Sequence, residues 1–515
     1  MDKKRLAINM SAQLLVFVIN LGISFVLTGV IDSSIDDGYG FVKTANDIVI
    51  WAQIVVSALN TMASRFITIQ LHKKDHEGAN EYFSSVFYAN LMMAGIFLLP
   101  AVCVVLFLNQ LFQVPGEILR DVQLLWSFVF LNFFVSIITS VFGVTTYSLN
   151  RLELTSFATI VSELARVSIL FITYRFFPAY LWYVGLGSVA ATGIVAAANF
   201  GYTRRLLPQV RIRKSFFRWK KVWELISLGA WNSVTRLGQV LLDGLDTVIA
   251  NVLIDAAAMN SLAIAKQIPT MLSSLMGTVV GVFTPSITIA YAREDRQELL
   301  DVIQSSNRIM IFMMSIPISF VVAYGRAFFS LWMSWRQDQE LLYRLAVLSM
   351  AVLFVSASIQ VLYHVFIITK KVRVNSLVMV GSGALTTAIV FVLLKTTDLG
   401  LYAIAGVSTV IGLVRNLTFT PIYAARCLQL KWNYFYRDIA MGLFSIVCIW
   451  ALGVISQLLF PIDSWTRLFL VGCGTGVVAL GVNFWIVLRK GEREMIFRKL
   501  KEKLGGGAGA GGAHE

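Results

Sequence analysis

The stretch Leu91–Leu108, LMMAGIFLLPAVCVVLFL, decides the fold class of this chain. It contains no charged side chain. An apolar run of this length is typical of a transmembrane helix, which needs about 20 apolar residues to cross a hydrocarbon core of about 30 Å. Strands of a membrane β-barrel are about 10 residues long and alternate strictly between apolar and polar residues, so the run does not fit that architecture.

The same apolar pattern recurs along the whole chain. Of its 515 residues, 57% are hydrophobic and only 14% are charged, and the mean hydropathy is +0.73. A soluble domain carries about 25% charged residues. The composition therefore excludes a water-soluble enzyme, a disordered chain and a nucleic-acid-binding domain, and it predicts an all-α integral membrane protein.

Fourteen segments are long and apolar enough to span a bilayer, and we expect a transmembrane helix in each of them. Their limits are Ala7–Val30, Gly40–Ile67, Tyr82–Leu108, Val122–Tyr147, Leu154–Phe177, Ala179–Tyr202, Trp223–Leu253, Asn260–Ala292, Val302–Tyr324, Leu341–Ile368, Val374–Leu394, Gly400–Ala425, Tyr434–Leu459 and Leu468–Leu488.

The placement of lysine and arginine predicts the orientation, because cytoplasmic loops of membrane proteins are enriched in both. Most of the 43 basic residues lie on one side of the membrane if the N-terminus is cytoplasmic, above all in Arg204–Lys221, Lys370–Arg373 and Arg489–Lys503. We therefore expect both termini in the cytoplasm. The formal net charge of +14 then indicates contact with anionic membrane lipids rather than with nucleic acid.

The longest hydrophilic connection, residues 203–221, suggests how the chain is divided. We expect an N-terminal lobe of six helices in 1–202, a basic cytoplasmic linker in 203–221 and a C-terminal lobe of six helices in 222–426. Two extra helices follow in 427–489, and 490–515 forms a basic cytoplasmic tail that ends in a glycine-rich linker.

A weak internal similarity supports two lobes. A shift of one constant number of residues aligns Ile31-Asp32 with Ile254-Asp255 and Lys43 with Lys266. Six helices separate the two copies, so both copies cross the membrane in the same direction. We therefore predict lobes related by a parallel pseudo-two-fold repeat, an arrangement that secondary transporters use.

Charged residues inside the predicted spans are the candidate functional residues. An ionisable residue at the centre of a bilayer costs about 2.5–3.5 kcal/mol on insertion scales, so it should face a cavity or a partner. The candidate cations are Lys43, Arg65, Arg166, Arg236, Lys266 and Arg415, and the candidate acids are Asp47, Glu163, Asp243 and Asp246. A cleft rich in lysine and arginine favours an anionic substrate such as a phosphate.

The same residues also allow a structural interpretation. Lys43 and Asp47 are four residues apart, and Glu163 and Arg166 are three apart, so each pair shares one helical face and could neutralise itself. Asp246 could pair with Lys266 across a short loop. Arg65 could anchor the end of its helix at the membrane interface.

Cysteine and histidine give no sign of a metal or redox site. The four cysteines form no CxxC motif and the four histidines are scattered, so neither a disulfide framework nor a zinc site is expected. We expect no cofactor and no catalytic residue.

Several short motifs resemble those of a known family. They are the turn Asp36–Gly40, the helix end Ser64-Arg65-Phe66, the run Leu245–Ile249 followed by Ala263–Lys266, and Phe283-Thr284-Pro285. Together with the helix count, they resemble the polysaccharide-export branch of the multidrug/oligosaccharidyl-lipid/polysaccharide exporter superfamily. That branch includes O-antigen flippases and other flippases of undecaprenyl-linked oligosaccharides.

The resemblance implies a V-shaped cavity between two lobes and transport by alternating access in the bacterial cytoplasmic membrane. The implied substrate is an undecaprenyl-pyrophosphate-linked glycan, moved from the inner to the outer leaflet, and glycan polymerase or assembly proteins are implied partners. By position, Lys43, Arg236 and Lys266 would meet the pyrophosphate, with Arg166 and Arg415 as weaker matches.

Three other functions stay open. A drug or cation antiporter of the same superfamily would rely on carboxylates such as Glu163, Asp243 and Asp246. A lipid II flippase usually carries arginines in its first helix, and this chain has none there after Arg5. A membrane glycosyltransferase or polymerase would need more room outside the membrane than the longest predicted outer loop, Gly325–Glu340, provides.

Overall fold

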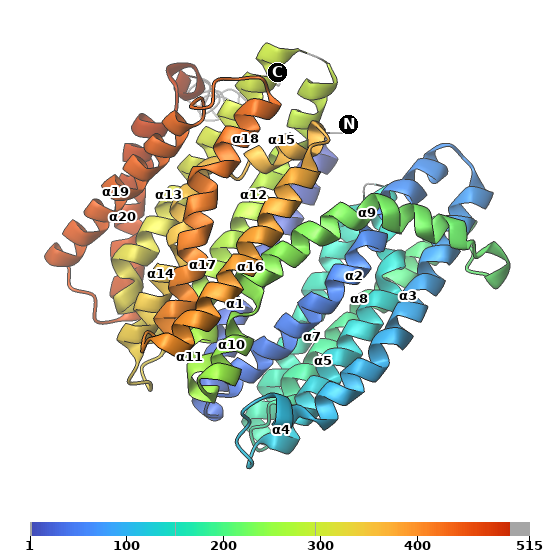
Figure 1. Cartoon of the computed structure of the whole chain (residues 1–515), viewed down its shortest axis with the longest axis horizontal. Coiled ribbons are helices and arrows are strands. Elements are labelled where there is room, and N and C mark those ends of the chain that lie inside the picture. The colour runs from blue at the N-terminus through green and yellow to red at the C-terminus, as the bar shows by residue number, and fades with distance from the viewer. Residues whose placement is uncertain (1–2, 150, 294, 495–515) are drawn as a thin grey trace, which may run out of the picture. The chain divides into compact units, whose positions relative to one another are not determined.

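The computed structural model describes the backbone of residues 3–149, 151–293 and 295–494, and the side chains of these residues from 16 on, except 17, 285 and 292. Within this part of the chain every regular element is a helix (Figure 1). The glycine-rich linker predicted at the end of the chain lies outside it.

In chain order, the helices are α1 (Lys3–Ser34), α2 (Gly38–His72), α3 (His76–Leu106), α4 (Leu108–Leu111), α5 (Leu119–Thr139), η1 (Ser140–Gly143), α6 (Val144–Ser148), α7 (Leu152–Phe176), α8 (Trp182–Leu206), η2 (Lys214–Phe216), α9 (Trp219–Gln239), η3 (Val240–Gly244), α10 (Asp246–Leu253), α11 (Ala256–Ala265), α12 (Gln267–Ala292), α13 (Arg296–Trp332), α14 (Gln339–Ile359), α15 (Leu362–Ile368), α16 (Val372–Thr396), α17 (Leu401–Leu417), α18 (Phe419–Cys427), α19 (Tyr436–Leu459) and α20 (Trp465–Val487).

The structure confirms a multi-pass, all-α membrane protein. In the described residues, twelve helical spans are long and apolar enough to cross a membrane, and α1 adds a shorter apolar stretch, Val18–Ser34. The predicted segment Trp223–Leu253 is helical as well, but it is divided among α9, η3 and α10. These spans together account for the fourteen helices expected from the sequence.

Several predicted spans are interrupted rather than continuous, and proline explains two of the breaks. Proline has no N–H group, so it cannot donate to the carbonyl four residues earlier. Pro269 follows the break between α11 and α12, which falls at Lys266. Pro421 follows the break between α17 and α18, where the hydroxyl of Tyr436 donates to the free carbonyl of Leu417 at 2.6 Å.

The chain divides into two compact units. Unit 1 comprises the residues up to Gln267 together with Val372–Ser408, and unit 2 comprises Ile268–Lys371 and the residues from Thr409 on. Unit 1 thus holds α9, α10 and α11, which the sequence assigned to the C-terminal lobe, because α2 packs directly on α9 and α11. The units describe packing in one conformation, so the two six-helix lobes remain a prediction.

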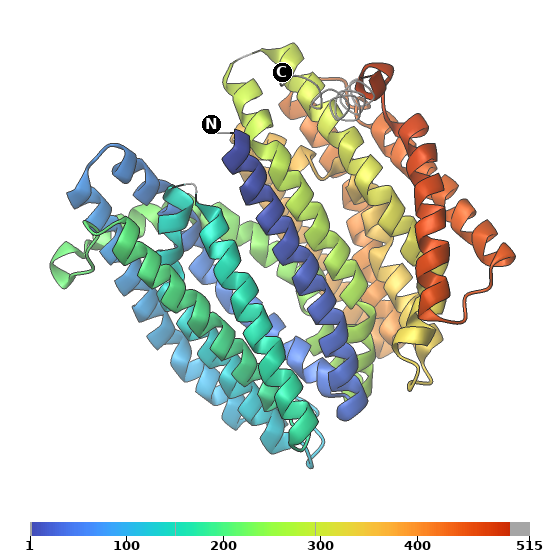
Figure 2. The same ribbon diagram turned by 180° about the vertical axis from the view of Figure 1, so that it is seen from behind.

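Close helix contact builds unit 1 around α2. A side chain at Gly229 of α9 would lie 2.0 Å from the carbonyl oxygen of Ala58 on α2, so only glycine permits this crossing. Beside it, the hydroxyl of Ser233 donates to the carbonyl of Ile54 at 2.6 Å and lies 3.1 Å from the hydroxyl of Ser57. On the opposite face of this unit, α7 and α8 run side by side (Figure 2).

The basic linker is attached to unit 1 along its length. Asn80, Ser84 and Ser85 of α3 exchange hydrogen bonds with the backbone of the linker at Gln209, Arg211, Arg213 and Arg218. Leu207 and Val210 enter the apolar core of the unit. The linker therefore lies along α3 as an ordered segment.

Unit 2 is centred on α13, which packs against α14, α19 and α20. Near the start of α13, the guanidinium of Arg308 binds both carboxylate oxygens of Glu492, with N···O distances of 2.6–3.1 Å. Glu492 follows α20, so this ion pair ties the segment after α20 to α13.

Candidate functional site

Two lysines and two aspartates from distant parts of the sequence meet in unit 1. Lys43 forms an ion pair with Asp47 one turn further along α2, and Lys266 forms an ion pair with Asp246. The hydroxyl of Thr247 donates to Asp47 at 3.0 Å and so connects the two pairs. We call these five residues the lysine–aspartate cluster.

Two irregular stretches of helix position the cluster. The π-helical stretch η3 precedes Asp246, and Lys266 stands at the break between α11 and α12. Wide helical turns of this kind occur frequently at functional sites. Carbonyls of η3 accept hydrogen bonds from outside the helix: Trp51 of α2 donates to Gly244 at 3.1 Å, and Lys266 reaches Asp243 at 3.4 Å.

Within the cluster the lysines are more exposed than their partners. The side chains of Lys43 and Lys266 are 24% and 14% exposed, while those of Asp47 and Asp246 are 7% and 5% exposed. Each lysine side chain is therefore more accessible to a ligand than the carboxylate it balances. This arrangement suits an anion better than a cation.

The first turn of α2 is held against α11 next to the cluster. The backbone N–H of Gly40 donates to Asn260 at 2.8 Å, and the amide of Asn260 donates to Asp32 at 2.7 Å. A side chain at Gly40 would lie 2.9 Å from the Cα atom of Asn260. The hydroxyl of Tyr39 donates to Gln267 at 2.5 Å.

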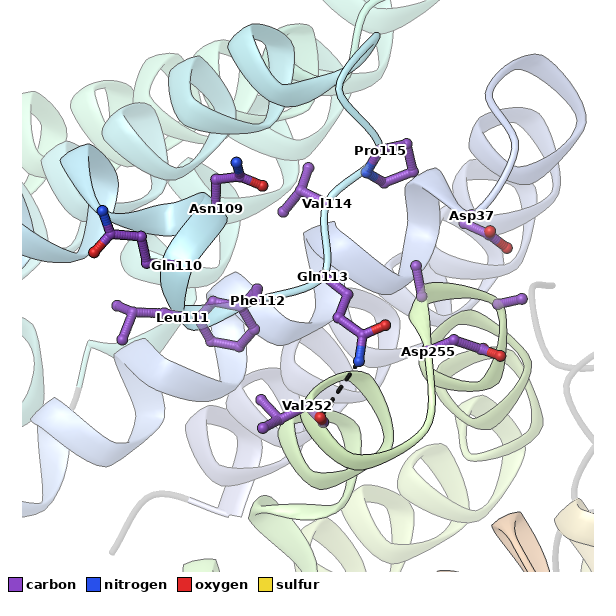
Figure 3. A pocket seen from close by; sticks show the side chains of 12 residues that line it. Asp37, Asn109, Gln110, Leu111, Phe112, Gln113, Val114, Pro115, Val252 and Asp255 are labelled. Carbon is purple, nitrogen blue, oxygen red and sulfur yellow. Dashed lines mark hydrogen bonds between the residues drawn. The ribbon is translucent and has the colours of Figure 1, made fainter.

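A cavity of about 570 Å³ lies beyond this turn, at the end of unit 1 that carries the α1–α2 and α10–α11 connections (Figure 3). Asp37 and Asp255 line it together with the α4–α5 loop. That loop is fixed to α10 because the backbone N–H and carbonyl of Gln113 both bind the buried amide of Asn251, at 2.8 and 3.2 Å. The cavity wall is thus continuous with the contact between α2 and α11.

Glu163 and Arg166 form a separate pair on α7. Their closest atoms are 3.1 Å apart, but the Nε–H of Arg166 is not aligned for a hydrogen bond. A side chain at Gly187 of α8 would lie 3.2 Å from Cγ of Arg166, so the glycine makes room for the arginine. The pairing that the spacing suggested is present, and Arg166 is again the more exposed partner.

Three predicted arginines lie apart from the cluster, and Asp243 interacts with it through its charge and its backbone carbonyl. Arg65 and Arg236 are exposed and make no ion pair within residues 16–494 as far as these are described. The side chain of Asp243 is also exposed. Arg415 belongs to unit 2, where its guanidinium donates to Asn416 at 3.3 Å.

Sequence reasoning missed three residues that organise the cluster. Thr247 supplies the hydrogen bond that connects the two ion pairs, and Gly40 and Asn260 hold α2 against α11 beside them. For Thr247 and Asn260 the available signal was a polar side chain inside an apolar run, since such a group needs a partner when it is buried.

Comparison with known proteins defines the family. The profile described as "Polysaccharide biosynthesis protein" matches residues 3–290, more than half of the chain. The chain belongs to this family. The match includes the whole lysine–aspartate cluster, and it confirms the resemblance to the polysaccharide-export branch of the superfamily.

One relative of this chain is the "Uncharacterized membrane protein EpsK" of Bacillus subtilis (strain 168). It is 25% identical over 502 residues, which cover 97% of this chain and 99% of the relative. The similarity therefore extends over all the helices, including those of unit 2.

Solved structures share the fold at low sequence identity. An inward-facing multidrug resistance MATE family transporter of the MOP superfamily superposes with a TM-score of 0.67 at 11% identity, over 82% of this chain and 98% of that chain. The lipid II flippase MurJ in an inward closed conformation superposes with a TM-score of 0.63 at 11% identity, over 93% of this chain and 99% of that chain. The family member thus has the membrane fold of this exporter superfamily.

Proposed function

We propose that this protein is a flippase for an undecaprenyl-pyrophosphate-linked oligosaccharide, such as a unit of O-antigen, capsule or exopolysaccharide. It moves the lipid-linked glycan from the cytoplasmic to the outer leaflet by alternating access. No bond is broken in this process, so the protein works as a transporter and not as an enzyme. The prenyl tail stays in the lipid while the head group crosses.

The observation that carries the proposal is the exposure of Lys43 and Lys266. Both ammonium groups lie inside helices that the sequence places in the membrane, and both are more accessible than the carboxylates that balance them. Each lysine is already balanced by an aspartate, and its side chain stays the more accessible member of the pair, which suits contact with an anionic ligand. The pyrophosphate of a lipid-linked glycan is such a ligand, and the family's role in polysaccharide biosynthesis supports this choice.

Arg236, Arg166, Arg65 and Arg415 are proposed as further contacts along the path of the head group. We place the protein in the bacterial cytoplasmic membrane with both termini in the cytoplasm. Anionic lipids contact its basic linker, and glycan polymerase or assembly proteins receive its product.

The exposed carboxylate of Asp243 is compatible with a second function. A drug or cation antiporter of the same superfamily would bind its cation or proton at such a group, and one structural relative is a multidrug transporter. Transport of lipid II is the other rival, since a second structural relative is a lipid II flippase.

The test replaces Lys43 and Lys266 with alanine, singly and together, in a host whose own copy has been deleted. Surface polysaccharide should fall more than tenfold in the double variant at a protein level within twofold of the wild type. Normal polysaccharide at normal protein level would overturn the proposal. Resistance to cationic drugs, and growth of a host depleted of its lipid II flippase, are measured on the same strains to test the two rivals.

A further inference from the structure

The lysine–aspartate cluster joins parts of the chain that alternating access must separate. Asp47 lies on α2, whereas Asp246 and Thr247 lie on α10. The sequence assigns α2 to the first six helices and α10 to the second six. The hydrogen bond from Thr247 to Asp47 therefore crosses the predicted boundary between the lobes.

Asp47 and Asp246 lie near each other, and each is neutralised by a lysine. Thr247, which binds Asp47, is the next residue after Asp246, and Asp246 lies within electrostatic range of both Asp47 and Asp243. Three carboxylates thus share this region with the two lysines of the cluster. Two carboxylates at short range repel each other unless a cation or a proton balances them.

A phosphate that binds both lysines would remove this balance. Each lysine side chain is the more exposed member of its pair, so we expect it to turn from its aspartate to an incoming phosphate while the aspartate stays in place. The buried carboxylates of Asp47 and Asp246 would then be left without partners, and breaking a buried pair in this way is strongly destabilising.

We propose that the lysine–aspartate cluster is a latch that the phosphate of the substrate opens. Binding of the phosphate withdraws Lys43 and Lys266 from Asp47 and Asp246, and the uncompensated aspartates then drive α2 away from α10. The proposal rests on the proposed function, since it assumes that the two lysines meet a phosphorylated head group. It adds that the aspartates couple substrate binding to opening at this end of the molecule.

The contact between Ser57 and Ser233 provides a reporter for the separation of α2 from the α9–α10 segment. Their hydroxyls lie 3.1 Å apart, so cysteines at both positions should form a disulfide while the helices are in contact. The native cysteines Cys103, Cys427, Cys448 and Cys473 are first replaced with alanine. The full chain with S57C and S233C is reconstituted in lipid nanodiscs, and disulfide formation is followed by the loss of maleimide-reactive thiols.

The probe is inorganic pyrophosphate, with sulfate at equal ionic strength as the control anion. Pyrophosphate should slow disulfide formation at least threefold, and sulfate should not. With D47N and D246N together, pyrophosphate should bind at least threefold more tightly, because the lysines lose their internal competitors. The rate of disulfide formation should nevertheless no longer respond to it, because the repulsion is gone. E492Q in unit 2 is the matched control and should leave the response unchanged.

Two results would overturn different claims. If pyrophosphate binds in a manner that requires Lys43 and Lys266 but the rate of disulfide formation in the S57C/S233C chain is unchanged, the latch is wrong and the proposed function stands. If K43A/K266A binds pyrophosphate as tightly as the parent chain does, the phosphate site itself is wrong, and the latch fails with it.

Discussion

The lysine–aspartate cluster of unit 1 and the Arg308–Glu492 pair of unit 2 differ in which partner is buried. In the lysine–aspartate cluster the carboxylates are buried and the lysines are the more accessible groups. In unit 2 the side chain of Arg308 is 5% exposed and that of Glu492 is 21% exposed, so there the cation is the buried member. Arg308 also makes several aligned hydrogen bonds to Glu492.

This difference separates a site from a structural contact. Arg308 is buried and its Nε and Nη2 groups bind both carboxylate oxygens of Glu492, so this pair holds the segment after α20 against α13. Lys43 and Lys266 are more exposed than the aspartates that balance them. Their remaining N–H donors therefore stay available to a ligand. The exposed fraction of each side chain in an ion pair is therefore more informative about function than the presence of the pair alone.

The largest expected effect comes from inverting one pair of the cluster. K43D combined with D47K keeps two opposite charges on one face of α2 but buries the cation and exposes the carboxylate. Surface polysaccharide should fall more than tenfold while the protein level stays within twofold, because an anion then meets a carboxylate first. Polysaccharide at the wild-type level would show that the order of exposure has no role.

Removing the carboxylate in unit 2 should act on stability instead. E492A leaves Arg308 buried without its partner and should lower the free energy of unfolding by about 3 kcal/mol. Thermal unfolding in detergent measures this loss, and polysaccharide export per folded molecule should stay close to normal. A large loss of export without loss of stability would remove the distinction between the two regions.

A methyl group at Gly40 should weaken the contact between α2 and α11. G40A places Cβ 2.9 Å from the Cα atom of Asn260, and overpacking of this kind costs about 1–3 kcal/mol. The matched control is G95A on α3, where nothing lies within 4 Å. It should leave the melting temperature unchanged or slightly raised, and equal effects of the two changes would contradict the prediction.

A smaller effect should follow from acid. Burial by itself would raise the pKa of Glu492, but the hydrogen bonds and charge of Arg308 outweigh it and hold the pKa below the usual range. Since the folded pKa is depressed, the contribution to stability is complete above the unfolded value of about 4.3. It is lost as the pH falls through the folded pKa. The melting temperature of the wild type should therefore fall more steeply below pH 4 than that of E492Q.

The sequence was sufficient to predict the helical spans, because an apolar run of 20 residues has few alternatives in a membrane. It was also sufficient to suggest the pairs Lys43–Asp47 and Glu163–Arg166, since spacing along one helix places both side chains on one face. The interruption near Lys266 was predicted, because Pro269 lies just after it. The break at η3 was not predicted, because neither hydropathy nor a proline marks it. It depends on contacts from another helix, such as the bond from Trp51 to the carbonyl of Gly244.

The connection between the pairs also lay beyond sequence reasoning. Thr247 is an ordinary residue within an apolar run, and its role depends on α2 approaching α10 in space. The exposure of each charged side chain is likewise a property of packing. By sequence, Arg236 and Lys266 are equally good candidates for a substrate-binding cation. In the structure, of these two, Lys266 is the one that forms an ion pair, with Asp246.

The hydrogen bonds from Asn80, Ser84 and Ser85 to the linker have a consequence for assembly. A flexible connection between the two halves would allow domain swapping, in which two molecules exchange equivalent halves and form a dimer. Here such an exchange would first have to detach the linker from α3 and pull Leu207 and Val210 out of the apolar core. Each copy therefore keeps its own second half while it is inserted and folded in a crowded membrane.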